Sequence, residues 1–516
     1  MNRREFVKAG AAATLAMGVK SPAEPHVAKK RPNVLFVFAD QHRAQSLPGE
    51  AFSPVIAPNL EKFRSANFSM DTCVSNYPLC TPYRGILMSG RWPTQSGITH
   101  NNQSLSMMEG ALGQTFQAAG YSTGYVGKWH LGGHGETPGF IPPGPRRLGF
   151  EDWHVWDATN QHYHAWTYDP KTGEKIFPEG WQPIPMTDEA ITFLKTQSKE
   201  KPWFLVVSYN PPHPPYNPPK EEQDRYSPNK LPLRPNVHTE PAGPEMTGEQ
   251  RYLVSEDEIR QAMQGYFGAI SGVDEQFERL LKTLDETGQA EDTIVIYTSD
   301  HGDMMGSHGR MGKQVPFEES CRVPFIVRYP GVTRTGGRSD VLFAAIDIYP
   351  TLCGLTGIRA PSNCVGRDLS GVIRGEAVRE SKMVFLMNQV EDMDLDASED
   401  GEEPVQPMRL GQGRRMGGDN GRGHAGEGGR GTLEFVNLPS YRGVRTKTHT
   451  YAVTLTGRWL LYDNHSDPYQ TKNLVHDPAQ LPLMERLDAA IEAWMKTTGD
   501  TFCFRENTKR ISTFPA

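Results

Sequence analysis

Four apolar stretches of the chain each run directly into polar side chains of the kinds that take part in catalysis. They read PNVLFVFAD, YSTGYVGKWH, PWFLVVSYNPPH and DTIVIYTSDH. Near-continuous apolar runs, as opposed to alternating ones, predict strands that helices bury on both faces. Helix-like segments lie between these runs, so the sequence predicts an α/β fold with a large mixed, mostly parallel sheet sandwiched by helices.

The polar ends of these predicted strands indicate where a site would form. In parallel sheets, ligands bind just beyond the carboxyl ends of the strands, which share one edge. Any one of the polar residues alone could lie in an ordinary turn, but four strands that all end in this way favour a shared site. The residues expected at that edge are Asp40, Lys128, His130, His213, Asp300 and His301.

Some of these side chains are suited to holding a metal ion. Asp40, Gln41 and Asp300 offer oxygen ligands, which favour a hard cation such as Ca²⁺. The nitrogen of His301 leaves Mn²⁺ or another divalent cation open. The alternative for Asp40 alone is a strand-end turn or a helix cap, which is common.

The stretch SNYPLCTPYRGILMSGR raises the question of what Cys80 does, since a cysteine can be a buried thiol, half of a disulfide or a nucleophile. Pro82 fits the first turn of a helix that begins at Cys80, where free N–H groups and the helix dipole favour anions. Arg84 lies one turn further along the same face. Among the other cysteines there is no Cys-x-x-Cys pair, and the spacing leaves open whether Cys353 and Cys364 pair or stay free.

Further cationic and proton-transferring groups complete the predicted chemistry. A metal together with Arg84, Lys128, Lys313 and two histidines suits a substrate that carries a tetrahedral anion such as sulfate or phosphate. The residues alone therefore predict a metal-dependent hydrolase of anionic esters, and they leave the anion open.

The net charge and the N-terminal sequence indicate which partners to exclude and where the protein is located. The chain of 516 residues has a formal charge of −7, which argues against a nucleic-acid partner because such proteins usually carry a basic domain. Residues 1–30 contain Arg3-Arg4 and then a short apolar run, which looks like a twin-arginine export signal, as opposed to a Sec signal or an ordinary helix. We therefore expect a periplasmic or extracellular protein, and no apolar run is long enough to predict an integral membrane segment.

Five blocks of the sequence resemble one known family. CTPYRGILMSGR looks like the signature of the formylglycine-dependent (type I) sulfatases, Cys-x-Pro-x-Arg followed by a short helix and Ser/Thr-Gly. PNVLFVFADQ, GYVGKWHLG, NPPHPPY and SDHGDMMGSHGRMGK resemble other blocks of that family, in the same order. The family belongs to the alkaline-phosphatase-like superfamily, whose fold agrees with the α/β prediction.

The resemblance implies a specific mechanism. A maturation enzyme would oxidise Cys80 to formylglycine, whose hydrate is a gem-diol. One hydroxyl would attack sulfur and release the alcohol, and loss of a proton from the second would expel sulfate. By the same resemblance, Asp40, Gln41, Asp300 and His301 hold the cation with the residue derived from Cys80.

The resemblance also implies roles on the substrate side of the site. Arg84 would steady the diol, while Lys128 and Lys313 would bind sulfate oxygens. His130 would be the base of the elimination, and His213 the acid toward the leaving oxygen, shared with Lys313. Asn101, at the matching place after the cysteine motif, would contact substrate.

One departure from the family pattern concerns the cation. Many members have Asp-Asp where this chain has Asp40-Gln41, and Asp-Asn where it has Asp300-His301. An amide in place of a carboxylate removes one negative charge.

Two other functions remain open: a formylglycine-dependent phosphonate or phosphate-ester hydrolase, and a non-catalytic protein that binds sulfated glycans. The pair Lys128 and His130 favours the sulfatase.

The domain prediction follows from where the patterns change. Residues 31–378 are expected to form the catalytic domain, and residues 379–516 a smaller C-terminal α+β domain with an antiparallel sheet and a closing helix. An insertion around 391–432, first acidic and then rich in glycine and arginine, predicts a flexible loop; its arginines could alternatively cover the site.

The substrate is the least determined part. The stretch Phe150–Asp169 is rich in His, Trp and Tyr, which suit the wall of a sugar pocket, although an aromatic loop packed on the core fits equally well. With export, this favours a sulfated glycan over a sulfated small molecule such as choline sulfate or an aryl sulfate.

Overall fold

The structure is a computed structural model, and it describes residues 31–105, 108–133, 139–163, 165–239, 255–390 and 438–504. The predicted export signal, residues 1–30, and the predicted insertion around 391–432 lie outside these ranges. The described residues from Pro32 onward form one compact unit. No helix in the described ranges has an apolar run that could cross a bilayer.

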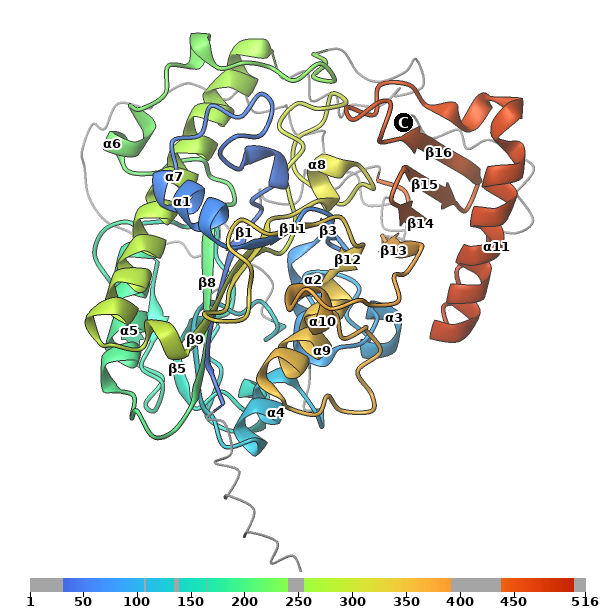
Figure 1. Cartoon of the computed structure of the whole chain (residues 1–516). Coiled ribbons are helices and arrows are strands. Elements are labelled where there is room, and N and C mark those ends of the chain that lie inside the picture. Colours follow the sequence, from blue (N-terminus) through green and yellow to red (C-terminus); the bar gives the residue numbers. More distant parts are fainter. Residues whose placement is uncertain are drawn as a thin grey trace, which may run out of the picture. The chain divides into compact units, whose positions relative to one another are not determined.

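A central sheet of eight strands organises the molecule (Figure 1). Its order is β11-β2-β10-β9-β1-β8-β4-β5, and β10 runs antiparallel to both of its neighbours, whereas the other pairs are parallel. The strands are β1 (Asn33–Asp40), β2 (Phe68–Met70), β4 (Ser122–Lys128), β5 (Asp152–Trp156), β8 (Trp203–Pro212), β9 (Thr293–Ser299), β10 (Phe325–Arg328) and β11 (Arg338–Ser339). The mixed, mostly parallel sheet predicted from the sequence is confirmed.

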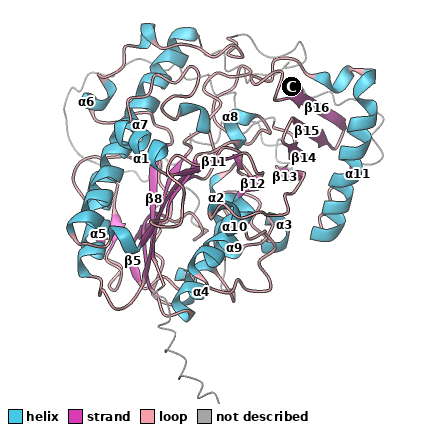
Figure 2. Cartoon of the chain, viewed as in Figure 1, coloured by secondary structure: helices cyan, strands magenta, loops and turns pink. Residues whose placement is uncertain are grey.

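Helices cover both faces of this sheet, as the separate layers in Figure 2 show. One face carries α1 (Pro58–Ala66), α5 (Pro183–Thr196) and α7 (Glu256–Glu286). The other face carries α2 (Cys80–Ser89), α3 (Pro93–Ser96), α4 (Leu112–Ala118), α9 (Ala345–Thr356) and α10 (Ser370–Ile373). Side chains of β1 alternate between the two cores: Leu35 and Val37 pack on one side, and Phe36 and Phe38 on the other. This explains why the strand sequence is apolar without interruption.

The chain then forms a second, antiparallel sheet of four strands, as predicted. It contains β13 (Met383–Asn388), β14 (Tyr441–Thr446), β15 (His449–Thr454) and β16 (Gly457–Asp463), in that order. The closing helix α11 (Leu481–Thr498) places Trp494 in a stack on Phe385, with the ring centroids 4.9 Å apart. The predicted boundary at 378–379 falls between α10 and β13.

The second sheet is bonded to the segment that leads into Cys80. The backbone N–H of Met387 donates to the carbonyl of Asn76, whose side chain donates to the carbonyl of Phe385 at 2.7 Å. Arg445 of β14 forms an ion pair with Glu318, at 2.9 Å. The bonds of Asn76 connect the antiparallel sheet to the segment before α2, and the ion pair of Arg445 connects it to the short helix α8 (Glu318–Cys321).

The remaining described elements are short. The strands are β3 (Cys73–Val74), β6 (Thr167–Tyr168), β7 (Lys175–Ile176) and β12 (Phe343–Ala344), and the helices are α6 (Lys220–Gln223) and α8 (Glu318–Cys321). All six cysteines are free in the structure, so the disulfide considered between Cys353 and Cys364 is not formed.

Candidate active site

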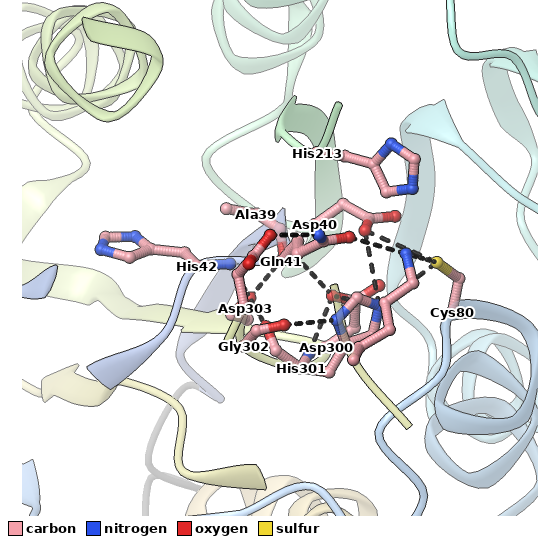
Figure 3. Close-up of polar contacts among 12 residues, drawn as sticks. Ala39, Asp40, Gln41, His42, Cys80, His213, Asp300, His301, Gly302 and Asp303 are labelled. Atoms are coloured by element: carbon pink, nitrogen blue, oxygen red, sulfur yellow. Dashed lines mark hydrogen bonds and ion pairs between the residues drawn. The ribbon is translucent and has the colours of Figure 1, made fainter. Parts of the chain in front are cut away.

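The residues predicted at the strand ends meet at the carboxyl edge of the central sheet (Figure 3). Strand β1 lies between β8 and β9, and it ends at Asp40, after a register shift that pairs Asp40 with Pro212. Asp300 and His301 directly follow β9, and His213 directly follows β8. The parallel arrangement therefore brings together groups that are up to 261 residues apart in the sequence.

Cys80 is the first residue of α2 and faces this edge. Its sulfur lies 3.5 Å from Asp40 Oδ1, 3.2 Å from His301 Nε2 and 3.5 Å from Lys313 Nζ. The N-cap residue Leu79 has no side-chain acceptor for the first turn. The helix N-terminus therefore adds its positive dipole end to the cations around Cys80.

The unmodified thiol of Cys80 is poorly suited to act as a nucleophile. Burial, and then the charge of Asp40, raise the pKa of Cys80 to about 11, against the opposing effect of Lys128 and Lys313. An unmodified Cys80 is therefore a neutral thiol near pH 7, whereas the nucleophilic form of cysteine is the thiolate.

Four side chains form a cluster that could hold a metal ion. One ligand atom from each of Asp40, Cys80, Asp300 and His301 lies within 4.8 Å of the others, and all four residues are buried. Two carboxylates and an imidazole fit a divalent cation, and the position of the Cys80 side chain would add a fourth ligand. The donor set therefore fits the cation that the sequence predicts.

The electrostatics of the two carboxylates differ. Burial opposes the charge of Asp40, but the positive charges of Lys128 and Lys313 outweigh it, and the pKa of Asp40 lies well below its usual value. Burial and the neighbouring charge of Asp40 raise the pKa of Asp300 to about 7. Two adjacent buried carboxylates repel each other, and a divalent cation between them would remove that repulsion.

Gln41 borders this cluster. Its backbone adopts a left-handed conformation, with φ at 75°, and its N–H donates to Asp300 Oδ1 at 3.0 Å. Its side-chain oxygen accepts from Lys313 Nζ at 2.6 Å, and its side-chain nitrogen donates to Asp303.

Arg84 lies beneath the carboxylates and is fully buried. Its Nη2 is 3.2 Å from Asp40 Oδ2 and 3.4 Å from Asp300 Oδ2. Its Nη1 donates to the carbonyl of Lys128 and to Ser208 Oγ. Its Nε has no hydrogen-bond partner within the described ranges. Arg84 thus braces the two acids and retains one buried donor.

The two lysines lie at the opening of the cluster. Lys128 Nζ donates to Asp40 Oδ2 at 2.7 Å and is 3.9 Å from the sulfur of Cys80. With Lys313 Nζ 3.5 Å from the same sulfur, two cations flank the atom at which the reaction is predicted to occur.

The histidines are buried and neutral. Burial first, and then the charges of nearby cations, hold the pKa of both His130 and His213 well below the usual value. Neither ring nitrogen of His130 is bonded to any residue that the structure describes, whereas Nδ1 of His213 lies 2.7 Å from the carbonyl of Pro214.

Asn101 lies at the side of this group. Its side-chain oxygen accepts from the backbone N–H of Thr81, and its carbonyl accepts from the Thr81 hydroxyl. It therefore accepts hydrogen bonds from the backbone N–H and the hydroxyl of Thr81, the second residue of α2. With Asn101 at that position, all the predicted site residues lie at or beside one edge of the sheet.

Two buried residues near the site were not predicted. His162 is 1% exposed; the side chain of Asn217 is near its ring, and neither ring nitrogen forms a hydrogen bond of good geometry in the described part of the chain. Burial and the charge of Lys128 lower the pKa of His162 to about 3. Asp303 is fully buried against Gln41. The His-rich stretch Phe150–Asp169 was the only sequence signal for His162, and the close spacing to His301 the only one for Asp303.

Comparison with known proteins identifies the family of the chain. The Sulfatase family model matches residues 32–358. An ulvan-active sulfatase of Formosa agariphila is 32% identical over 482 residues, which cover 92% of this chain and 83% of that protein. An endo-4-O-sulfatase of Bacteroides thetaiotaomicron is 29% identical and covers 90% of this chain and 91% of its own.

A solved structure shows the same architecture. It comes from work on glycosaminoglycan metabolism by Bacteroides thetaiotaomicron, and it is 25% identical to this chain with a TM-score of 0.73. The match covers 93% of this chain and 99% of that one.

Proposed function

The chain belongs to the sulfatase family, and from that premise we propose that it hydrolyses the sulfate ester of a sulfated glycan through a formylglycine formed from Cys80. The observation that carries the proposal is the position of Cys80 at the start of α2. Its sulfur lies within 3.9 Å of two cations, a carboxylate and an imidazole.

Two groups would complete the site. A divalent cation, Ca²⁺ by the oxygen-rich donor set, would be held by Asp40, Gln41, Asp300 and His301, and would favour the ionised form of a hydroxyl beside it. Formylglycine, as its hydrate, would supply one hydroxyl that attacks sulfur and a second whose deprotonation lets sulfate leave.

The chain's own residues would bind and orient the sulfate group. Lys128 and Lys313, on either side of Cys80, would each contact a sulfate oxygen, and the helix N-terminus would attract the same anion. Arg84 would hold Asp40 and Asp300 in place and offer its Nε to the converted residue one turn before it.

Two histidines would carry out the proton transfers. Lys128 and Lys313 are among the groups that keep the pKa of His213 low. A bound sulfate anion would offset these charges and raise the pKa of His213, so that it could carry a proton to the leaving alcohol oxygen. His130 is neutral and would accept the proton whose loss releases sulfate.

The substrate class rests on the relatives and on one loop. One relative is named for activity on ulvan, a sulfated polysaccharide, and the stretch Phe150–Asp169 brings His162 to the site. We propose that this loop contacts the sugar next to the sulfate. An export signal at residues 1–30 would place the enzyme where such polymers are met.

The test is a comparison of matched esters. The converted enzyme is assayed on sulfate monoesters, phosphate monoesters and phosphate diesters of one alcohol, and on sulfated oligosaccharides, with Cys80→Ala as the control. We expect the sulfated oligosaccharide to give the highest kcat/KM. A dominant phosphodiesterase rate would favour the phosphonate or phosphate-ester hydrolase instead, and binding without turnover would favour the glycan-binding protein.

A further inference from the structure

A buried carboxylate lies behind Gln41, on the far side from Lys313. The side-chain nitrogen of Gln41 donates a short hydrogen bond to Asp303 Oδ2. The hydroxyl of Tyr216 donates to the same oxygen at 2.7 Å, and the backbone N–H of Met305 donates to Oδ1 at 2.9 Å. Asp303 has no exposed surface, and Figure 3 shows it beside Gln41.

These contacts determine which way the Gln41 amide faces. Every partner of the Asp303 side chain named above is a donor, so the carboxylate acts only as an acceptor. The amide must then present its NH₂ group to Asp303 and its oxygen to the opposite side. There the oxygen accepts from Lys313 Nζ, 2.6 Å away and itself 3.5 Å from the sulfur of Cys80. A rotated amide would place its oxygen against a carboxylate and its NH₂ against an ammonium group.

The same contact bears on the charge of the site. Gln41 carries no charge, so the cation cluster itself has two carboxylates, Asp40 and Asp300. Asp303, which accepts a hydrogen bond from the Gln41 NH₂ group, adds a third negative charge near the cluster. This hydrogen bond polarises the amide and makes its oxygen more negative. Groups that hydrogen-bond to a metal ligand commonly orient it in this way and raise its basicity.

We propose that Asp303 is a positioning residue that fixes the Gln41 amide with its oxygen toward Lys313, on the side of the proposed cation site, and supplies a negative charge from behind it. This rests on the cation site of the proposed function. Asp303 itself touches neither the cation nor the substrate, because Gln41 lies between.

The proposal is tested by exchanging the two partners. In Asp303→Asn the new amide can accept from or donate to Gln41, so the orientation is no longer enforced. In Gln41→Glu two carboxylates face each other. In the double variant Gln41→Glu/Asp303→Asn, the asparagine NH₂ donates to the glutamate, which restores one hydrogen bond with its direction reversed.

The measured quantity is the dissociation constant of Ca²⁺, obtained by calorimetry on the full chain after chelation and dialysis, together with the melting temperature in EDTA. We expect Asp303→Asn to weaken Ca²⁺ binding by about 10- to 100-fold. We expect the double variant to bind Ca²⁺ more tightly than Gln41→Glu alone. Tyr216→Phe is the matched control, because it removes one donor to Asp303 and keeps the carboxylate, and it should change binding less than threefold.

Two results would overturn the proposal. One is an Asp303→Asn protein that melts at a lower temperature but binds Ca²⁺ as tightly as the parent, which would show a purely structural role. The other is a double variant whose loss of affinity equals the sum of the two single losses, which would show no coupling. Because Ca²⁺ binding is measured without substrate, the outcome stands apart from whether the ester is a sulfate.

Discussion

The site has two walls, which differ in how far their polar side chains are hydrogen-bonded to the protein. The cation wall, Asp40, Gln41 and Asp300, has hydrogen bonds or ion pairs to protein on each side chain. The histidine wall contains His130 and His162: no described residue bonds to either ring nitrogen of His130, and His162 has Asn217 as a polar neighbour without a hydrogen bond of good geometry.

The difference fits the roles proposed for the two walls. A buried polar group without a partner typically costs about 1–3 kcal/mol, so it persists where something outside the protein completes it. The paired wall would fix the geometry of a small ion in advance. The unpaired wall would leave His130 able to accept a proton and His162 able to contact the sugar, as proposed above.

The largest expected effect is at Cys80, which lies between the walls. Cys80→Ala removes the proposed source of the nucleophile, and we expect kcat to fall on the order of 10⁶-fold, the scale seen when a covalent nucleophile is deleted. The measurement is steady-state turnover of the sulfated oligosaccharide. The exposed Cys503→Ala is the control and should keep full activity. Comparable losses in the two variants would contradict the assignment of Cys80.

Cation removal tests the paired wall. Chelation with EDTA should abolish turnover and lower the melting temperature, because Arg84 would then be left to offset the repulsion between Asp40 and Asp300 without the cation. Ca²⁺ should restore both. Asp300→Asn should melt at nearly the same temperature with and without Ca²⁺. If the melting temperature of the parent protein changes with neither EDTA nor Ca²⁺, there is no cation site here.

His130 tests the unpaired wall by its chemistry. We expect His130→Ala to lower kcat by about 10²- to 10⁴-fold, the usual contribution of a general acid or base. Pre-steady-state kinetics should show a burst of released alcohol followed by slow sulfate release, because the base of the second step is missing. Release of alcohol and sulfate at equal rates, with no burst, would place His130 elsewhere in the mechanism.

His162 tests the same wall by its binding. We expect His162→Ala to raise KM for a sulfated oligosaccharide about 10-fold and to change kcat less, since one hydrogen bond to the sugar is lost. A small aryl sulfate should be nearly unaffected. Equal losses on both substrates would assign His162 to the sulfate group in place of the sugar.

The smallest effect concerns a buried histidine away from both walls. His308 stacks on Phe317 with the ring centroids 4.0 Å apart, and burial lowers its pKa to about 4. Between pH 6.5 and 4 the unfolded chain then binds more protons than the folded one. Stability should therefore fall as the pH falls through this range, by as much as about 3 kcal/mol from this group.

Denaturant unfolding at several pH values measures this, with His308→Gln as the variant. The variant should lose stability less steeply over the same range. His465→Gln, a change at another histidine of the chain, is the control and should keep the parent slope. Equal slopes in His308→Gln and the parent would show that His308 does not carry the dependence.

The sequence predicted the cation wall better than the histidine wall, for a physical reason. Asp40 and Asp300 end long apolar strands, and parallel pairing alone forces such ends to one edge. His162 follows β5 in a loop, and nothing in its neighbours determines where that loop passes. Asp303 was not predicted because its contact with Gln41 depends on the left-handed backbone at Gln41. Glycine or asparagine usually indicates such a conformation, and neither stands at this position.

The state of Cys80 is the measurement that tests the central claim most directly. Trypsin should release the peptide Ser65–Arg84, which contains Cys80 and also the buried thiol of Cys73 as an internal control. In protein made with its maturation enzyme and shown to be active, mass spectrometry should find sulfur replaced by a carbonyl oxygen at Cys80 and an intact thiol at Cys73. An active protein with two intact thiols would contradict the account.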